Sequence, residues 1–222
     1  MNARMAREAV EQARPADLID LLNKGLDPDI GFDGGFSLLA LACKADYPLH
    51  AAALLAAGAD VDSTAGEFGS PLGAAASFSF LGRENRCILL LVEAGAKVDS
   101  KAVSGRSPLM LACDRGNVEN IKALLGAGAD PYEVDMEDCN AMVISAWARQ
   151  TEAVGALLEA GIDPRAKPEG AISALDVAKH SERPSPKCAN WVRSCAAALD
   201  EREAIEKAAS VSGWKEASKP RL

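Results

Sequence analysis

Residues Gly105–Pro131 read GRSPLMLACDRGNVENIKALLGAGADP, and they carry the start and stop signals of two short helices. Ser107 is a good N-cap, and Pro108 fits the first helical position because its missing N–H would have no partner there. Gly116 ends the first helix, and a second helix runs to Gly128, which suits a positive φ angle. The stretch therefore predicts a helical hairpin.

The same landmarks return at fixed distances along the chain. A turn of the type Gly-(Ala/Leu/Ile)-(Asp/Lys) recurs in one register with a small polar capping residue. Both sets are separated by 33, 37, 33 and 33 residues, so one unit carries four extra residues. These regular steps indicate an array of one repeated hairpin. The turns begin at Gly25, Gly58, Gly95, Gly128 and Gly161, and the capping residues are Ser37, Ser70, Ser107, Asn140 and Ser173.

Each predicted helix is shorter than the roughly 12–15 residues at which an isolated helix becomes marginally stable in water. Burying a Leu, Ile or Val side chain contributes about 1.5–3 kcal/mol, and most of the apolar surface of a short hairpin can be covered only by neighbouring hairpins. Aromatic residues make up only 5% of the chain, so the core must pack small aliphatic side chains closely. We therefore expect an all-α chain that folds by stacking its units.

In period and motif the chain resembles the ankyrin-repeat family, whose unit has about 33 residues and the signature T-P-L-H-x-A. The clearest matches are Gly105–Pro131 and LLAAGADVD at Leu54–Asp62, and the resemblance covers about Arg4–Leu199. It implies an ankyrin-repeat solenoid of about six helix-turn-helix units with a long C-terminal capping helix. The signature His bonds neighbouring loops in the family, and its absence here predicts less tightly tied loops. Its place is taken by Ala40, Gly73, Met110, Val143 and Asp176.

We expect a single ankyrin-repeat domain over residues 1–209, with units at about 3–29, 30–62, 63–99, 100–132, 133–165 and 166–209. The four extra residues of the third unit fall between its two helices, near Ser77–Arg86. The capping helix is predicted from about Lys187 to Ala209, with Trp191 facing inward, and residues 210–222 are predicted to be frayed.

The chain is acidic, with 24 Lys and Arg residues against 32 Asp and Glu residues and a net charge of −8. This charge repels nucleic-acid backbones on average and favours a neutral or basic protein partner. No apolar run reaches the roughly 18–20 residues that span a bilayer, and the N-terminal residues lack a signal-type apolar segment. We therefore expect a cytoplasmic protein that binds neither nucleic acid nor membrane.

The sequence contains no pattern typical of an enzyme, a cofactor site or a metal site. His50 and His180, the two histidines, fall in different units and are interpreted as surface residues. Aspartates such as Asp29 and Asp62 are interpreted as turn residues, because the spacing and closing Glu of a calcium loop are missing. The six cysteines lack the spacing of zinc ligands and are interpreted as reduced, structural thiols. We expect no catalytic residue, no cofactor and no metal.

In ankyrin arrays the loop tips, called fingers, and the exposed side of the first helices form a concave groove that binds other proteins. The resemblance implies a partner-binding surface at the finger residue before each cap and at the end of each first helix. Aromatic residues and Arg are enriched in binding hot spots. The alternative is that Phe78 packs under the third-unit insertion and that Trp147 fills a gap beside small Ala residues. The candidate partner-binding residues are Phe36, Lys44, Phe78, Arg106, Asp114, Arg115 and Trp147.

The sequence thus predicts a non-catalytic protein–protein interaction module that is monomeric on its own. A more specific version is an inhibitor or an immunity-type neutraliser that masks a basic partner. One alternative is a small enzyme or ligand-binding protein with a pocket near the third-unit insertion, around Cys87 and Arg83. A further alternative is a scaffold that forms homo-oligomers through Trp191 or the terminal helix.

Overall fold

The computed structural model describes residues 2–30, 35–77, 86–167 and 172–180, together with residues 190, 192–194, 196–197, 200 and 203. Within these ranges the chain is helical, and one isolated bridge between Phe36 and Ala65 is the extent of its β-pairing. This confirms the all-α prediction. The helices are α1 (Asn2–Glu11), α2 (Pro15–Asn23), α3 (Leu38–Lys44), α4 (Pro48–Ala56), the 3₁₀ helix η1 (Gly66–Phe68), α5 (Pro71–Ser77), α6 (Arg86–Glu93), α7 (Pro108–Arg115), α8 (Val118–Gly126), α9 (Ala141–Trp147), α10 (Thr151–Glu159) and α11 (Ala174–His180).

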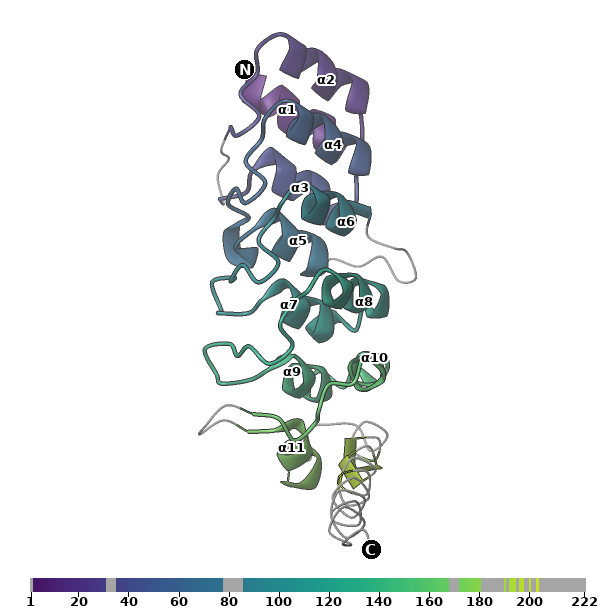
Figure 1. Cartoon of the computed structure of the whole chain (residues 1–222). Coiled ribbons are helices and arrows are strands. Elements are labelled where there is room, and N and C mark those ends of the chain that lie inside the picture. The colour runs from purple at the N-terminus through teal and green to yellow at the C-terminus, as the bar shows by residue number, and fades with distance from the viewer. Residues whose placement is uncertain are drawn as a thin grey trace, which may run out of the picture.

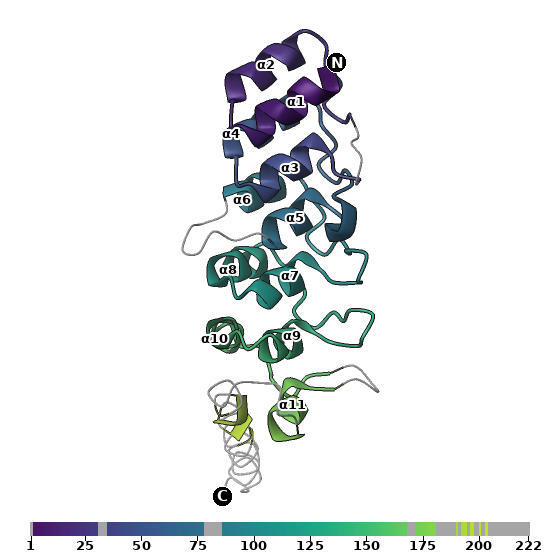
Figure 2. The same ribbon diagram turned by 180° about the vertical axis from the view of Figure 1, so that it is seen from behind.

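The helices form two rows that run along the length of the molecule, as Figure 1 shows and as Figure 2 shows from behind. Contacts join α1, α3, α5, α7, α9 and α11 in order, and we call these helices the first-helix row. Contacts also join α2, α4, α6, α8 and α10, which we call the second-helix row. Each hairpin contributes one helix to each row. The molecule is therefore the stacked solenoid that the repeat predicts.

The structure confirms the predicted signals at the helix ends. At each of the five capping residues, a side-chain oxygen accepts a hydrogen bond from the backbone N–H three residues later. The five turn glycines have φ angles between 81° and 90°, which a residue with a Cβ adopts only at a cost. The capping pairs are Ser37 with Ala40, Ser70 with Gly73, Ser107 with Met110, Asn140 with Val143, and Ser173 with Asp176.

A continuous apolar core lies between the two rows. Large side chains that are almost completely buried recur at one position of the first helices and at one position of the second helices. Because every hairpin supplies the same kind of side chain, each hairpin covers its neighbours and the core extends along the molecule. These residues are Leu39, Leu72, Leu109 and Met142 in the first helices, and Leu54, Leu91, Leu124 and Leu157 in the second helices.

A ladder of hydrogen bonds joins the turns of successive hairpins. Four residues after the turn glycine, a side-chain oxygen accepts a hydrogen bond from a backbone N–H of the next turn. The donors are 31 or 35 residues further along the chain. The four bonds run from the Asp60 N–H to Asp29 (2.9 Å), from the Lys97 N–H to Asp62 (3.0 Å), from the Asp130 N–H to Asp99 (3.2 Å) and from the Asp163 N–H to the Tyr132 hydroxyl (3.3 Å).

The capping side chains also join neighbouring hairpins. Ser37 accepts a hydrogen bond from the Ser63 hydroxyl over 2.8 Å, and the hydroxyls of Ser70 and Ser100 lie 2.6 Å apart. The side-chain amide of Asn140 donates to the backbone carbonyl of residue 166 over 3.2 Å. Other polar groups thus connect units from which the signature His is missing, and that the loops are less tightly tied than in the family stays a prediction.

The ladder provides a stability test. Replacing Asp62 with Ala is expected to lower the free energy of unfolding by about 1 kcal/mol, because the Lys97 N–H loses its acceptor. Replacing Asp62 with Asn keeps a side-chain oxygen in place and is expected to retain most of that stability. Urea unfolding followed by circular dichroism measures both variants. Equal losses would show that the carboxylate charge, rather than the hydrogen bond, is what matters.

The interpretation of His50 as a surface residue is wrong, since this side chain is only 3% exposed. Its ring lies 5.3 Å from that of Tyr47, and its Nε2 atom has no hydrogen-bond partner in the described part of the chain. Burial lowers the pKa of His50, because the charged imidazolium would lose its water, while a hydrogen bond with the Ala9 backbone opposes this shift. The side chain of His180 lies outside the described residues.

Acid is expected to destabilise the fold through His50. The pKa of the folded protein lies below the unfolded value of 6.5, so the unfolded chain takes up the proton first and stability is lost as the pH falls below 6.5. The loss is at most about 1.4 kcal/mol per pH unit. Asn120 occupies the equivalent position of α8 and donates to the Ala76 carbonyl, so His50→Asn is a matched variant that does not titrate. Urea titrations between about pH 7 and about pH 5.5 should show a smaller decrease for this variant, and an equal decrease would contradict the assignment.

Arg165 lies in the turn that contains the last donor of the ladder, and its side chain contacts the C-terminal helical segment. Its guanidinium lies 2.6 Å from carboxylate oxygens of Asp200 and Glu203 and 2.8 Å from Asp163. The described residues from Asn190 to Glu203 are helical, in the region where the long capping helix is predicted. Trp191 and residues 210–222 lie outside the described residues.

Candidate protein-interaction surface

Fingers and first helices share one side of the molecule. The fingers connect a second helix to the next first helix, and in Figure 1 they extend to the left of the first-helix row. We call the fingers together with α3, α5, α7 and α9 the finger–helix face. All predicted partner-binding residues except Phe78 belong to these elements, and Phe78 lies outside the described residues. The described finger residues are 24–30, 35–37, 57–70, 94–107, 127–140, 160–167 and 172–173.

Phe36 and Lys44 meet in an aromatic cluster on this face. The ring centroid of Phe36 lies 6.1 Å from that of Phe68, and the Lys44 Nζ lies 5.0 Å from the Phe36 centroid. Leu111 of α7 packs against the same cluster. A cation–π contact of this kind contributes about 0.5–1 kcal/mol at an exposed site. Phe36 is therefore half-buried and partly structural, and the sequence interpretation missed its neighbour Phe68.

Arg106 connects a finger to α7. Its Nε lies 3.3 Å from the carboxylate of Asp135, and its Nη1 lies 3.5 Å from the carboxylate of Asp114. The side chain of Asp135 is almost completely buried and also accepts hydrogen bonds from two backbone N–H groups of its own finger. Arg106 and Asp114 thus help to shape the finger, whereas Arg115, at the end of α7, is exposed.

Trp147 is the last residue of α9, and its side chain is half-buried against the main core. This packing agrees with the gap-filling alternative for part of the indole. The remaining surface of the ring stays accessible on the first-helix row. Trp147 therefore combines a structural contact with exposed aromatic area.

Two exposed apolar side chains at the finger tips were missed by the sequence interpretation. Val103 is 70% exposed and Met136 is 77% exposed. Each lies four residues before a capping residue, Ser107 for the first and Asn140 for the second. An apolar residue at this tip position, within a polar loop, is the signal that could have revealed them.

The described thiols are poor nucleophiles. Burial raises the pKa of Cys113 to about 12 and the pKa of Cys139 to about 11, so little thiolate forms at neutral pH. Cys87, which the alternative enzyme site requires, is fully buried. Cys43, Cys87, Cys113 and Cys139 are not in disulfide bonds, in agreement with the interpretation of structural thiols, while Cys188 and Cys195 lie outside the described residues.

No group of three or more His, Cys, Asp or Glu side chains in the described ranges is placed to hold a metal ion. None of the helices described is both long enough and apolar enough to cross a membrane.

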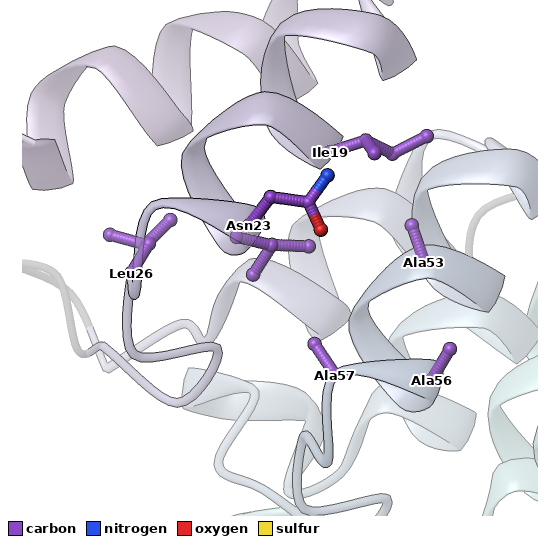
Figure 3. A pocket seen from close by; sticks show the side chains of 7 residues that line it. Ile19, Asn23, Leu26, Ala53, Ala56 and Ala57 are labelled. Atoms are coloured by element: carbon purple, nitrogen blue, oxygen red, sulfur yellow. The ribbon is translucent and has the colours of Figure 1, made fainter.

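An open pocket lined mostly by aliphatic side chains lies on the second-helix row, between α2 and α4. Its volume is about 480 Å³. Figure 3 shows Ile19 and Asn23 on one side and Ala53 and Ala56 on the other. Asn23 is the one polar side chain among the residues that line it, and no acid, base or nucleophile joins it. The pocket could hold an apolar group, but its lining supports no chemistry.

Stacked hairpins, capped first helices and projecting fingers define a helical-repeat protein. A family model for ankyrin repeats in three copies matches residues 72–168. Over 80 residues the chain is 36% identical to an ankyrin repeat protein, nuc-2, of Neurospora crassa. That match covers 36% of this chain and 8% of the relative, so the chain corresponds to a small part of that protein's length. Residues 72–168 are thus similar to the ankyrin-repeat family, whose repeats are generally protein–protein interaction modules.

Proposed function

We propose that this chain is a non-catalytic protein-binding module that holds a partner protein against its finger–helix face. The observation that carries the proposal is that large or charged side chains at the ends of several first helices keep accessible surface on this one face. Lys44, Arg115 and Trp147 are the last residues of α3, α7 and α9 in the first-helix row, and they are exposed or half-buried there. A row of short helices tied at every joint gives such side chains fixed positions before binding, which reduces the entropy lost on association.

The finer version of the proposal is a monomeric inhibitor or neutraliser of a basic partner. A net charge of −8 favours the encounter with a basic surface. The four cysteines in the described ranges are buried and not in disulfide bonds, which suits a reducing compartment such as the cytoplasm. Sedimentation of the purified chain should give the mass of one copy at all concentrations, and a mass that rises with concentration would favour the homo-oligomeric scaffold instead.

Affinity capture with a matched pair of variants tests the binding face. The test variant is Lys44→Ala/Arg115→Ala/Trp147→Ala, and the control is Leu89→Ala/Lys122→Ala, which changes exposed side chains of α6 and α8. A captured partner should bind the test variant at least about tenfold more weakly than the wild type, because hot-spot side chains carry most of the binding free energy. Its affinity for the control variant should stay within about twofold of its affinity for the wild type. A partner that binds all three proteins equally would contradict the proposal.

A further inference from the structure

The tips of three neighbouring fingers are joined into one continuous ridge. The Val103 N–H donates to the Glu67 carbonyl over 3.2 Å, and the Met136 N–H donates to the Ser104 carbonyl over 3.4 Å. The first bond links finger 57–70 to finger 94–107, and the second links finger 94–107 to finger 127–140. Fingers 94–107 and 127–140 lie beside α7 and α9, respectively, in Figure 1. We call the following five residues the fingertip ridge: Glu67, Val103, Met136, Glu137 and Asp138.

The apolar part of the ridge is formed by Val103 and Met136, which are exposed on adjacent fingers. The Met136 side chain lies against Gly105 of the neighbouring finger, where a Cβ would stand 3.0 Å from the Met136 Cγ. Its position is therefore set by a contact between fingers. Adjacent, exposed apolar side chains surrounded by polar residues are typical of a protein-interaction site.

The charged part of the ridge is acidic. The Lys101 Nζ lies 2.5 Å from a carboxylate oxygen of Glu133, the Lys97 Nζ lies 3.6 Å from one of Asp62, and Arg106 is paired with Asp135, so each basic side chain of these two fingers already faces a carboxylate. Glu67, Glu137 and Asp138 are exposed, and their carboxylates form no ion pair within the described residues. The three joined fingertips that include Val103 and Met136 therefore also carry three exposed carboxylates.

We propose that the fingertip ridge binds a protein segment in which Lys or Arg side chains flank an exposed aliphatic or aromatic side chain. The apolar side chain of the segment covers Val103 and Met136, and its basic side chains pair with the three carboxylates. This inference rests on the proposed function and specifies the chemistry of the partner. The net charge of −8 adds a long-range attraction for such a segment.

Peptide display on the full chain tests the inference. The enriched peptides are expected to place Lys or Arg beside an aliphatic or aromatic residue. One enriched peptide, synthesised with a fluorophore, is then titrated in fluorescence anisotropy. Its Kd should rise about tenfold for Val103→Ser/Met136→Ser and for Glu67→Gln/Glu137→Gln/Asp138→Asn, and the second variant should also lose most of the salt dependence seen with the wild type.

The matched control is Glu93→Gln/Glu119→Gln/Glu159→Gln, which removes the same charge from exposed positions of the second-helix row and should bind within about twofold of the wild type. Enriched peptides that are acidic or purely apolar, or that bind both charge variants equally, would overturn the ridge proposal. If such peptides bind the Lys44→Ala/Arg115→Ala/Trp147→Ala variant more weakly than the wild type, the proposed function survives. Self-association that the ridge variants abolish would identify a second copy as the occupant and would also overturn this inference. A display that enriches no peptide would count against both.

Discussion

Replacing Leu91 with Ala is expected to lower the free energy of unfolding by about 3 kcal/mol. Leu91 lies in α6, at the centre of the solenoid, and its side chain is completely buried. The loss combines the transfer free energy of the removed carbons with a cavity that α4 and α8 can fill only by moving along the stack. Because each hairpin is stabilised by its neighbours, a cavity in a central hairpin weakens two joints at once. Urea unfolding followed by circular dichroism measures the effect.

Leu89 provides a matched control on the same helix. It is 52% exposed, so Leu89→Ala makes the same chemical change without opening a cavity. Its expected cost is at most about 1 kcal/mol. Similar costs for the two variants would contradict the assignment of Leu91 to a tightly packed core. A separate unfolding transition at lower urea concentration in the Leu91→Ala variant would instead identify the joint at which two parts of the array unfold independently.

Replacing Gly73 with Ala is expected to destabilise the protein by about 2 kcal/mol, although the same change in an open helix is stabilising. Gly73 is the third residue of α5, and a Cβ there would stand 2.2 Å from the carbonyl oxygen of Phe68. That oxygen belongs to the backbone of η1, so the clash can be relieved only by shifting the finger away from the helix. The contact also explains why unit three cannot carry the family's His at this position.

Gly126, the last residue of α8, is the matched control for Gly73. A Cβ at Gly126 would meet no atom within 4 Å, and Gly126→Ala is expected to stabilise the protein by about 0.5 kcal/mol. Opposite signs for the two variants in thermal and urea unfolding would support the close approach of η1 to α5. A stabilising Gly73→Ala would show that the finger tolerates the added methyl group.

The features that could be predicted from the sequence are local. Ser107, Pro108 and Gly116 act within one helix, and their spacing fixes where that helix begins and ends. The period of 33 residues then predicts where the remaining hairpins lie, because the same signals recur in the same order. The order of stacking follows as well, since neighbouring hairpins are the nearest apolar surfaces available to each other.

The features that could not be predicted depend on contacts between hairpins. Asp62 has the features of a turn residue, and nothing next to it in the chain indicates that its oxygen reaches the backbone of residue 97. His50 is buried because α1 lies over it, and a pattern within α4 alone cannot show this. Arg106 could be assigned to a finger, but its pairing with Asp114 and Asp135 depends on how closely the next finger approaches.

The ladder acceptors Asp29, Asp62 and Asp99 bind a backbone N–H rather than a particular side chain. Every residue except Pro offers that donor, so a hairpin that ends in such an aspartate can be followed by almost any other hairpin. The units are in this respect interchangeable. Duplication, deletion or shuffling of single units would preserve the joints and change the length of the array and the order of side chains that it displays.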